Sequence, residues 1–270
     1  MLFSNIVGHS KQLSLMRRLA EIDRFPQSSL FVGPEGVGKR TVAEELLTYL
    51  TKSKLNVRVY GVDSPPSIRE VREFSEWLSM KPGEGERKAV IIDSADDMRG
   101  EAANALLKTL EEPPSYAFLT LIAKNENSVI PTIRSRCRVF RFGPLPESSL
   151  LYLLEKRGVR PNEKVLRISR GSIGLALRIL ESPVVELLEE FSSLVKSPKK
   201  IGLILPFCEK FSKLSREEAL IFLDALEVLI FEKSGNPKWG EAINRARYFL
   251  KFHGKPQSVV EWLLLEVFGI

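Results

Sequence analysis

The chain has 270 residues, of which 44% are hydrophobic and 27% are charged, and its formal net charge is +6. This is the composition of an ordinary folded protein. It excludes a largely disordered chain, and the length allows two or three domains with sizeable cores. The sequence shows neither a signal-peptide pattern nor an apolar run that could span a bilayer, so we expect a soluble, cytoplasmic protein with no membrane partner.

The net charge and the positions of the cysteines exclude few classes of partner. Lysine and arginine are spread along the whole chain, so the positive charge is compatible with a nucleic-acid partner but does not localise one. Cys137 and Cys208 lie far apart and form no CxxC pair. Zinc sites and disulfide frameworks use cysteines at closer, repeated spacings, so we expect two reduced thiols and no zinc.

The first elements are a turn, a helix and a strand. Residues 5–20 begin with a Gly-His-Ser turn and continue as a helix whose apolar positions recur at helical spacing. His9 lies in the turn without a neighbouring metal ligand, and we interpret it as a turn residue rather than a catalytic one. Residues 30–32 form a short apolar strand.

A glycine-rich loop, GPEGVGKRT at residues 33–41, follows this strand and opens a helix that runs to residue 50. A strand, a glycine-rich loop, a lysine and a helix in this order form a phosphate-binding P-loop. The glycines free the backbone to surround an anion, and the lysine reaches the terminal phosphates. The candidate nucleotide-binding residues of this loop are Gly33, Gly36, Gly38, Lys39, Arg40 and Thr41.

One position departs from the P-loop pattern. The residue after the lysine should be Ser or Thr, whose hydroxyl holds Mg²⁺, but here it is Arg40. We therefore assign no metal-binding residue. Two outcomes stay open for ATP: Arg40 contacts a phosphate in place of the metal, or its bulk blocks the pocket. We favour an empty or weakly occupied site.

A second nucleotide motif comes after a further strand and helix. Residues 57–62 predict the strand, and residues 68–80 predict the helix. Residues 88–93 are a continuous apolar run that ends in a carboxylate, as a central parallel strand buried on both faces does. The acid at the end of such a strand is the Walker B aspartate, so Asp93 joins the candidate nucleotide site.

The residues after Asp93 lack the expected base. Related ATPases place a glutamate there to activate the attacking water, but Ser94 and Ala95 cannot act as general bases at neutral pH. Asp96 and Asp97 lie past the strand end, on the way into a helix, and we interpret them as helix-capping residues. The metal ligand and the base are thus both altered, in two motifs that converge at one site.

The remaining elements complete an α/β sheet and an all-helical part. Residues 100–111 predict a helix stopped by two prolines, and a short helical segment at 129–137 separates strands at 117–123 and 138–142. Strands alternating with helices define a parallel five-stranded sheet with helices on both faces. Three short helices and about five longer ones follow, with no convincing strand.

The break at the Gly-Pro pair 143–144 predicts the domain boundary. We expect an α/β P-loop domain at residues 1–143, a three-helix lid at residues 144–182 and an all-α collar at residues 183–270. Amphipathic helices are usually core-forming, so an ordinary helical domain without a partner is the alternative for the collar.

Several motifs together make the chain resemble the AAA+ clamp-loader family. Residues 104–114, NALLKTLEEPP, look like that family's helix after Walker B, and residues 131–137, PTIRSRC, look like its SRC motif. Residues 6–9 are similar to its entry motif, and residues 67–73 are similar to its helix before Walker B. The resemblance covers residues 4 to about 180. It implies an AAA+ fold with an oligomerisation collar.

The resemblance also implies a role for Arg136. The SRC arginine of this family is an arginine finger that points into the ATP site of the neighbouring subunit, and Arg136 holds that position. A purely local ion pair with a nearby carboxylate is the alternative, because most surface arginines do no more than this.

Within the family, the departures are typical of one subunit class. A hydrolysing bacterial gamma subunit has Thr, Glu and a sensor-2 Arg where this chain has Arg40, Ser94 and Gly174. The chain is similar to delta-prime subunits of the DNA polymerase III clamp loader, whose own site is degenerate but which keep the finger. Both classes commonly carry a four-Cys zinc module between the Walker motifs, where this chain has no cysteine.

The implied partners are clamp-loader subunits of gamma/tau and delta type, the sliding clamp indirectly, and primer-template DNA through the complex. An ATPase that uses Thr41 or a water on Mg²⁺ is an alternative function. A stand-alone AAA+ DNA remodeller is disfavoured, because a motor needs intact Walker B chemistry.

Overall fold

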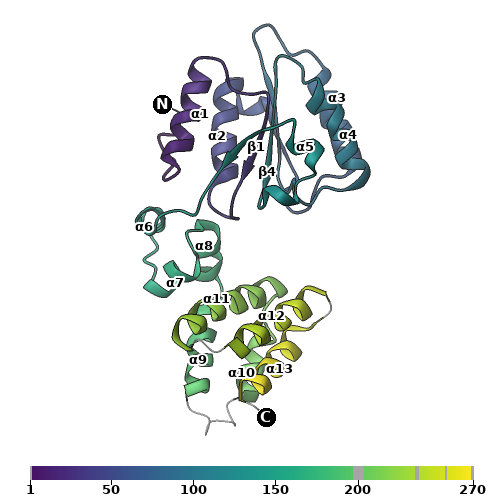
Figure 1. Cartoon of the computed structure of the whole chain (residues 1–270). Coiled ribbons are helices and arrows are strands. Elements are labelled where there is room, and N and C mark those ends of the chain that lie inside the picture. The colour runs from purple at the N-terminus through teal and green to yellow at the C-terminus, as the bar shows by residue number, and fades with distance from the viewer. Residues whose placement is uncertain (1, 197–203, 235–236, 253, 269–270) are drawn as a thin grey trace. The chain divides into compact units, whose positions relative to one another are not determined.

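A computed structural model describes residues 2–196, 204–234, 237–252 and 254–268, and the chain forms two compact units (Figure 1). Unit 1 consists of Met1–Ser149 and Ser172–Gly174, and unit 2 consists of Leu150–Gly171 and Leu175–Ile270. The division of the helical part into a lid and a collar stays a prediction.

Unit 1 is built on a five-stranded parallel sheet with the strand order β2-β3-β4-β1-β5. The strands are β1 (Ser28–Val32), β2 (Val57–Tyr60), β3 (Lys88–Ile92), β4 (Ala117–Ala123) and β5 (Arg138–Arg141). Strands β1, β3 and β4 are buried along their whole length, whereas the edge strand β5 exposes both of its terminal arginines. The predicted parallel sheet is confirmed.

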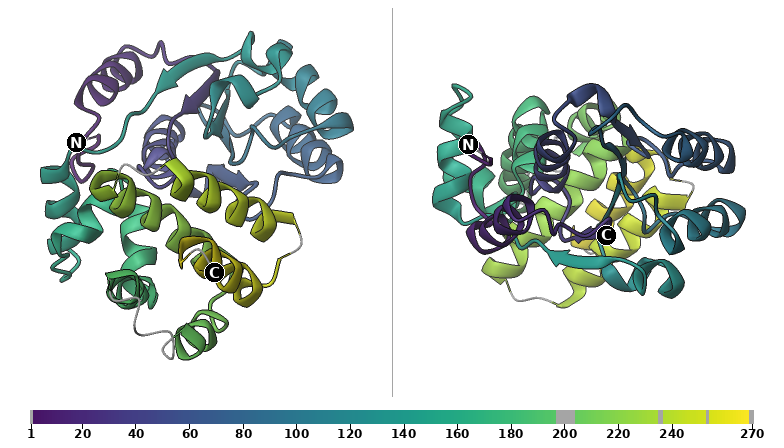
Figure 2. Two further views of the ribbon diagram at one scale, coloured as in Figure 1. Left: turned by 60° about the horizontal axis from the view of Figure 1, so that its bottom comes forward. Right: turned by 90° about the horizontal axis from the view of Figure 1, so that it is seen from above.

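Helices cover both faces of this sheet (Figures 1 and 2). Helices α1 (Ser10–Glu21) and α2 (Lys39–Thr51) pack on one face, and α3 (Ile68–Ser79), α4 (Gly100–Glu111) and α5 (Pro131–Arg134) pack on the other. Each helix turns an apolar stripe to the sheet, for example Leu46 of α2 in the first core and Leu106 of α4 in the second. Two cores on opposite faces of one sheet fix the carboxyl ends of the strands at a single edge.

Two elements of unit 1, strand β2 and helix α5, are shorter than predicted. Strand β2 ends at Tyr60 because Gly61 takes a φ of 78°, outside the extended region. Glycine is required there, since a Cβ would lie 2.2 Å from the Asp93 carbonyl oxygen. Helix α5 covers Pro131–Arg134 only, because Pro131 begins it and the chain turns into β5 after Ser135. Two short 3₁₀ turns, Lys54–Asn56 and Glu126–Ser128, complete the loops.

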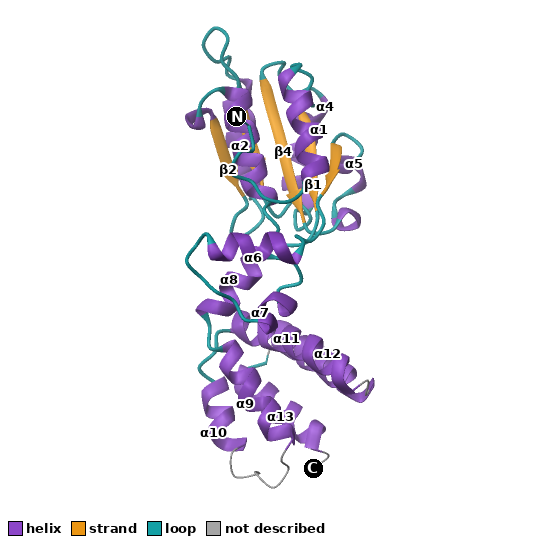
Figure 3. Cartoon of the chain, turned by 90° about the vertical axis from the view of Figure 1, so that its left-hand side faces the viewer, coloured by secondary structure: helices purple, strands orange, loops and turns teal. Residues whose placement is uncertain are grey.

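The regular secondary structure of unit 2 is all helical among the residues described. Its helices are α7 (Glu163–Ile168), α9 (Val184–Lys196), α10 (Ile204–Phe211), α11 (Arg216–Ser234), α12 (Pro237–Phe252), α13 (Pro256–Phe268) and most of α6 (Glu147–Glu155) and α8 (Ile173–Glu181). Buried rings of Phe191, Phe207, Phe211 and Phe222 pack together in its core. Helix α11 lies beside α12, which lies beside α13 (Figure 3). Within the described ranges, no helix is both long and apolar enough to cross a membrane.

Candidate functional site

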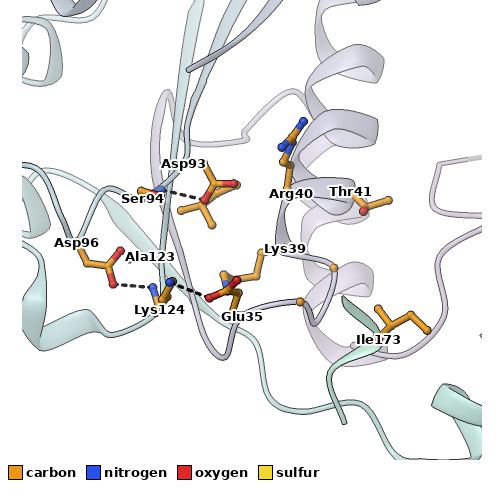
Figure 4. A pocket seen from close by; sticks show the side chains of 13 residues that line it. Glu35, Lys39, Arg40, Thr41, Asp93, Ser94, Asp96, Ala123, Lys124 and Ile173 are labelled. Atoms are coloured by element: carbon orange, nitrogen blue, oxygen red, sulfur yellow. Dashed lines mark hydrogen bonds and ion pairs between the residues drawn. The ribbon is translucent and has the colours of Figure 1, made fainter. Parts of the chain in front are cut away.

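The P-loop opens into a cavity of about 230 Å³ at the carboxyl ends of β1, β3 and β4 (Figure 4). Its lining residues are Glu35, Gly36, Gly38, Lys39, Arg40, Thr41, Asp93, Ser94, Asp96, Ile122, Ala123, Lys124 and Ile173. Open α/β sheets bind ligands at this edge because parallel strands all end there. The structure thus brings together every predicted nucleotide-site residue except Gly33, which is not among the lining residues.

The loop backbone requires its glycines. Gly38 caps α2 with a φ of 97°, and Gly36 has a φ of 73°, conformations that glycine adopts without strain. At Gly33 a Cβ would lie 2.1 Å from the carbonyl oxygen of Phe142, so the loop passes too close to β5 for any side chain. The first residues of α2 line the cavity, and helix N-termini are favourable sites for anions.

His9 supports the loop from outside the cavity. Its Nε2 lies 2.9 Å from the carbonyl oxygen of Val37, and its ring packs edge-on against Phe142, with the ring centroids 5.0 Å apart. The residue has a φ of 51° and is the N-cap of α1, so it lies between the predicted turn and the helix. Its bracing contact with the P-loop was not predicted.

Lys39 is turned onto the loop itself. Its Nζ donates hydrogen bonds to the carbonyl oxygens of Gly33 and Pro34, each at 2.6 Å, and only 6% of the residue is exposed. Burial lowers its pKa from 10.5 to about 8, against the opposing charges of Asp93 and Glu35. The side chain is still mostly protonated at neutral pH, and it bridges the two ends of the glycine-rich turn.

Arg40 and Thr41 leave the metal position without a hydroxyl. Arg40 lies on the side of α2 that faces Asp93, and its Nε donates to Glu44 one turn along the helix at 2.9 Å (Figure 4). Thr41 is directed away from Asp93 in the same view, since consecutive helical residues point about 100° apart. The residues present therefore do not fit the Mg²⁺ that P-loop enzymes hold at this point.

Asp93 is flanked by a residue that cannot activate water. The backbone N–H of Ser94 donates to Asp93 Oδ1 at 2.9 Å, and Ser94 has a φ of 54°. Burial raises the pKa of Asp93, and the Ser94 N–H together with the positive charges of Arg40 and Lys39 only partly offsets this shift. The carboxylate is thus kept in place by its own strand end, with no second carboxylate directly after it.

Asp96 does not cap the following helix. Its Oδ2 accepts hydrogen bonds from the backbone N–H groups of Lys124, at 3.0 Å, and Asn125, at 3.4 Å. Helix α4 begins after Arg99, which makes no side-chain capping bond, so the capping prediction for Asp96 and Asp97 is wrong. Oδ2 of the buried carboxylate is thus held by amides of the loop after β4, whereas Oδ1 is buried without a hydrogen-bond partner among the described residues.

An ion pair joins the P-loop to the loop after β4. Lys124 Nζ lies 2.7 Å from Glu35 Oε2, and this contact raises the pKa of Lys124 (Figure 4). Both side chains are about half exposed, so solvent screens the pair. Neither residue was predicted, although Lys124 directly follows a strand that ends at this edge.

Gly174 packs against the P-loop within unit 1. Its N–H donates to the carbonyl oxygen of Gly36 at 3.1 Å, and a Cβ at position 174 would lie 3.0 Å from Gly36 Cα. An arginine at this position, as a sensor-2 residue requires, would therefore displace the loop.

Arg136 lies at the sheet edge formed by β5 and does not line the P-loop cavity. Its Nη2 donates to Glu111 Oε1 at 2.5 Å, and its Nη1 donates to the Thr132 carbonyl oxygen at 2.9 Å. About a third of the side chain is exposed. The local ion pair foreseen as an alternative is present, and the finger role, which concerns a second chain, stays a prediction.

Comparison with known proteins agrees with this architecture. The family described as DNA polymerase III, delta subunit, matches residues 57–146. The Replication factor C small subunit of Aeropyrum pernix is 35% identical over 194 residues, covering 66% of this chain and 56% of that protein. The DNA polymerase III subunit gamma of Buchnera aphidicola subsp. Schizaphis graminum is 27% identical over 214 residues, covering 66% and 57%. These similarities support a clamp-loader AAA+ subunit.

The chain spans little more than half of the length of those relatives. Solved structures share its fold along most of the chain. A DNA polymerase III gamma subunit-related protein from Thermotoga maritima has a TM-score of 0.57 at 21% identity, covering 93% of this chain and 98% of that one. The RuvB Holliday junction branch migration motor from the same organism has a TM-score of 0.52 at 16% identity, covering 94% and 88%. The predicted AAA+ fold is confirmed.

Proposed function

We propose that this protein is a non-hydrolysing, delta-prime-like subunit of a DNA polymerase III clamp loader. It supplies Arg136 and a scaffold to ATPase neighbours of gamma/tau type, beside a delta-type subunit, and the assembly loads the sliding clamp on primer-template DNA. The observation that carries the proposal is the altered P-loop pocket, where Arg40 pairs with Glu44 in place of a metal-binding hydroxyl.

The chemistry of the pocket supports a protein that does not hydrolyse ATP itself but contributes to hydrolysis by a neighbour. A metal ligand and a water-activating carboxylate each contribute roughly several kcal/mol of transition-state stabilisation, and this pocket lacks both. Arg136, in contrast, keeps a planar, permanently charged fork at the sheet edge. Such a group stabilises the charge spread over a transferring phosphoryl group, and it contributes roughly 10³ to 10⁵ in rate when supplied to a neighbour's site.

A gamma-like ATPase with a modified site is the second candidate. The glycine cradle, Lys39 and Asp93 favour it, as does the similarity to a protein named as a gamma subunit. Such an enzyme must hold Mg²⁺ through Thr41 or through water alone. Because Thr41 is directed away from Asp93, we rank this function below the first (Figure 4).

The proposal is tested by assembling the protein with the clamp-loader ATPase subunits of its own organism and measuring DNA-stimulated ATP hydrolysis. Arg136→Ala is expected to lower turnover by about 10³-fold. Arg138→Ala, two residues away and exposed at the start of β5, is the matched control and should leave turnover unchanged. Equal turnover of wild type and Arg136→Ala, with assembly intact by gel filtration, would remove the main role assigned to this protein.

A further inference from the structure

The contacts of Arg136 connect two elements of unit 1 that are separate in sequence. Arg136 follows α5, and its partner Glu111 is the last residue of α4, on the other side of β4 in the chain. The two terminal nitrogens have different acceptors, since Nη2 donates to the Glu111 carboxylate and Nη1 donates to the Thr132 carbonyl oxygen. The guanidinium is therefore fixed in orientation as well as in position.

Both supports of the guanidinium rest on packed structure. Helix α4 is anchored in the second core by Leu106 and Leu110, and it stops before Pro113, so Glu111 has little freedom to follow the arginine elsewhere. On the other side, α5 is anchored by buried Ile133. A side chain held between two anchored elements loses less rotamer freedom when it meets a ligand.

The arrangement leaves part of the fork available. Three hydrogen bonds use Nη1 and Nη2, the third being a long one of 3.5 Å from Nη1 to Ser135 Oγ, and Nε makes no hydrogen bond to any residue within the part of the chain that the structure describes. A guanidinium has five N–H donors. The donors that these contacts do not use can therefore bind a phosphate while the observed contacts persist.

We infer that Glu111 is a positioning residue for Arg136: it holds the guanidinium in the orientation from which it reaches the phosphates bound by a neighbouring subunit. The inference rests on the proposed function. It assigns to Glu111 a role that acts through the arginine, without contact to nucleotide.

The neighbouring residue Glu112 provides a matched control. It carries the same charge at the same helix end and is also exposed, but none of the hydrogen bonds or ion pairs among the described residues involves its carboxylate. A change at position 112 therefore reproduces the loss of one negative charge without loss of the Arg136 contact.

The test uses the complete assembly with its ATPase subunits, primed DNA and clamp, and it measures kcat and KM for ATP. Glu111→Ala is expected to lower kcat by about fivefold, which corresponds to the loss of an exposed ion pair of about 1 kcal/mol, with little change in KM. Glu111→Gln, which keeps a carbonyl acceptor, should fall between wild type and Glu111→Ala. Glu112→Ala should match wild type.

A double-mutant cycle separates positioning from a merely structural role. In the Arg136→Ala background, Glu111→Ala should cause no further loss, because the group it positions is absent. An equal additional loss in that background, a raised kcat in Glu111→Ala, or equal effects of the 111 and 112 variants would overturn the inference. If Arg136→Ala itself leaves turnover unchanged, the proposed function fails instead, so the two failures are distinguishable. Thermal unfolding of each variant confirms that the fold is retained.

Discussion

The P-loop pocket and the Arg136 corner each contain an arginine paired with a glutamate, yet the two pairs have different consequences. Arg40 pairs with Glu44 along one helix, beside Asp93 in the cavity. Arg136 pairs with Glu111 across two elements, at the exposed sheet edge. The first arginine displaces a metal ligand from the chain's own site, whereas the second is oriented outside that site. Location relative to the phosphate cradle, rather than the ion pair itself, decides what each arginine does.

The largest effect that we expect is the low ATP hydrolysis rate caused by the altered P-loop pocket. The isolated protein should hydrolyse ATP at least about 10³-fold more slowly than an intact ATPase subunit of its organism, since two catalytic groups are missing. Arg40→Thr with Ser94→Glu should regain only part of the rate, because Gly174 still packs against Gly36 without a sensor arginine. Phosphate release measures both rates. Full rescue by the double variant would show that the pocket needs no sensor arginine.

At the other region, the shape of the arginine can be tested separately from its charge. Arg136→Lys keeps the charge but loses the planar fork that bonds both Glu111 and the Thr132 carbonyl. We expect it to lower turnover of the assembly by about 10²-fold, because lysine and arginine are not interchangeable at such sites. Arg138→Lys serves as the control. Wild-type turnover by Arg136→Lys would mean that a point charge is sufficient.

The buried lysine of the pocket should make stability depend on pH. The pKa of Lys39 is about 8 in the folded protein and 10.5 when the side chain is exposed, as in the unfolded chain. Between these pH values the unfolded chain therefore binds more protons than the folded protein. The free energy of unfolding of the wild type should therefore rise between pH 8 and pH 10.5 relative to Lys39→Met, by no more than about 3.4 kcal/mol. Below pH 8 the difference should be constant. Urea unfolding at a series of pH values measures it, and a flat difference would contradict the lowered pKa.

The smallest effect is expected at the Glu35–Lys124 pair across the cavity. Glu35→Gln removes a negative charge and frees Lys124, so it should tighten binding of a fluorescent ATP analogue by up to about fivefold. Lys124→Gln removes a positive charge and should weaken binding by a similar factor. Fluorescence titration with this analogue, with and without Mg²⁺, provides the comparison. Effects of the same sign in both variants would mean that the pair acts only by holding the loops.

Local patterns predicted the sheet and most of its helices, because apolar runs and helical periodicity report burial directly. The P-loop and Walker B motifs also predicted which residues meet at the cavity, since parallel strands end at a common edge. Lys39, Arg40 and Asp93 do lie together there. The altered chemistry of this pocket could therefore be described from the sequence.

Pairings between side chains of separate loops were not predictable in the same way. The contact of Lys124 with Glu35 and that of Arg136 with Glu111 depend on loop register, which no periodicity reports. The capping prediction at Asp96 was wrong for a related reason. The carboxylate could accept hydrogen bonds either from a nearby helix end or from distant backbone amides, and in the structure it accepts from the Lys124 N–H. Which of these donors is used depends on the tertiary structure.

The central claim is that this protein serves a neighbour's site through Arg136 and has no hydrolytic site of its own. It is tested most directly in one assembly, with ATPase subunits in which only the site adjoining this protein retains its P-loop lysine. Turnover should fall by at least about 10²-fold with Arg136→Ala, because this change removes a group from the neighbour's active site. With Lys39→Ala, turnover should stay within about twofold of wild type, because Lys39 lies in a site that does not hydrolyse ATP. A large loss with Lys39→Ala and wild-type turnover with Arg136→Ala would contradict the account.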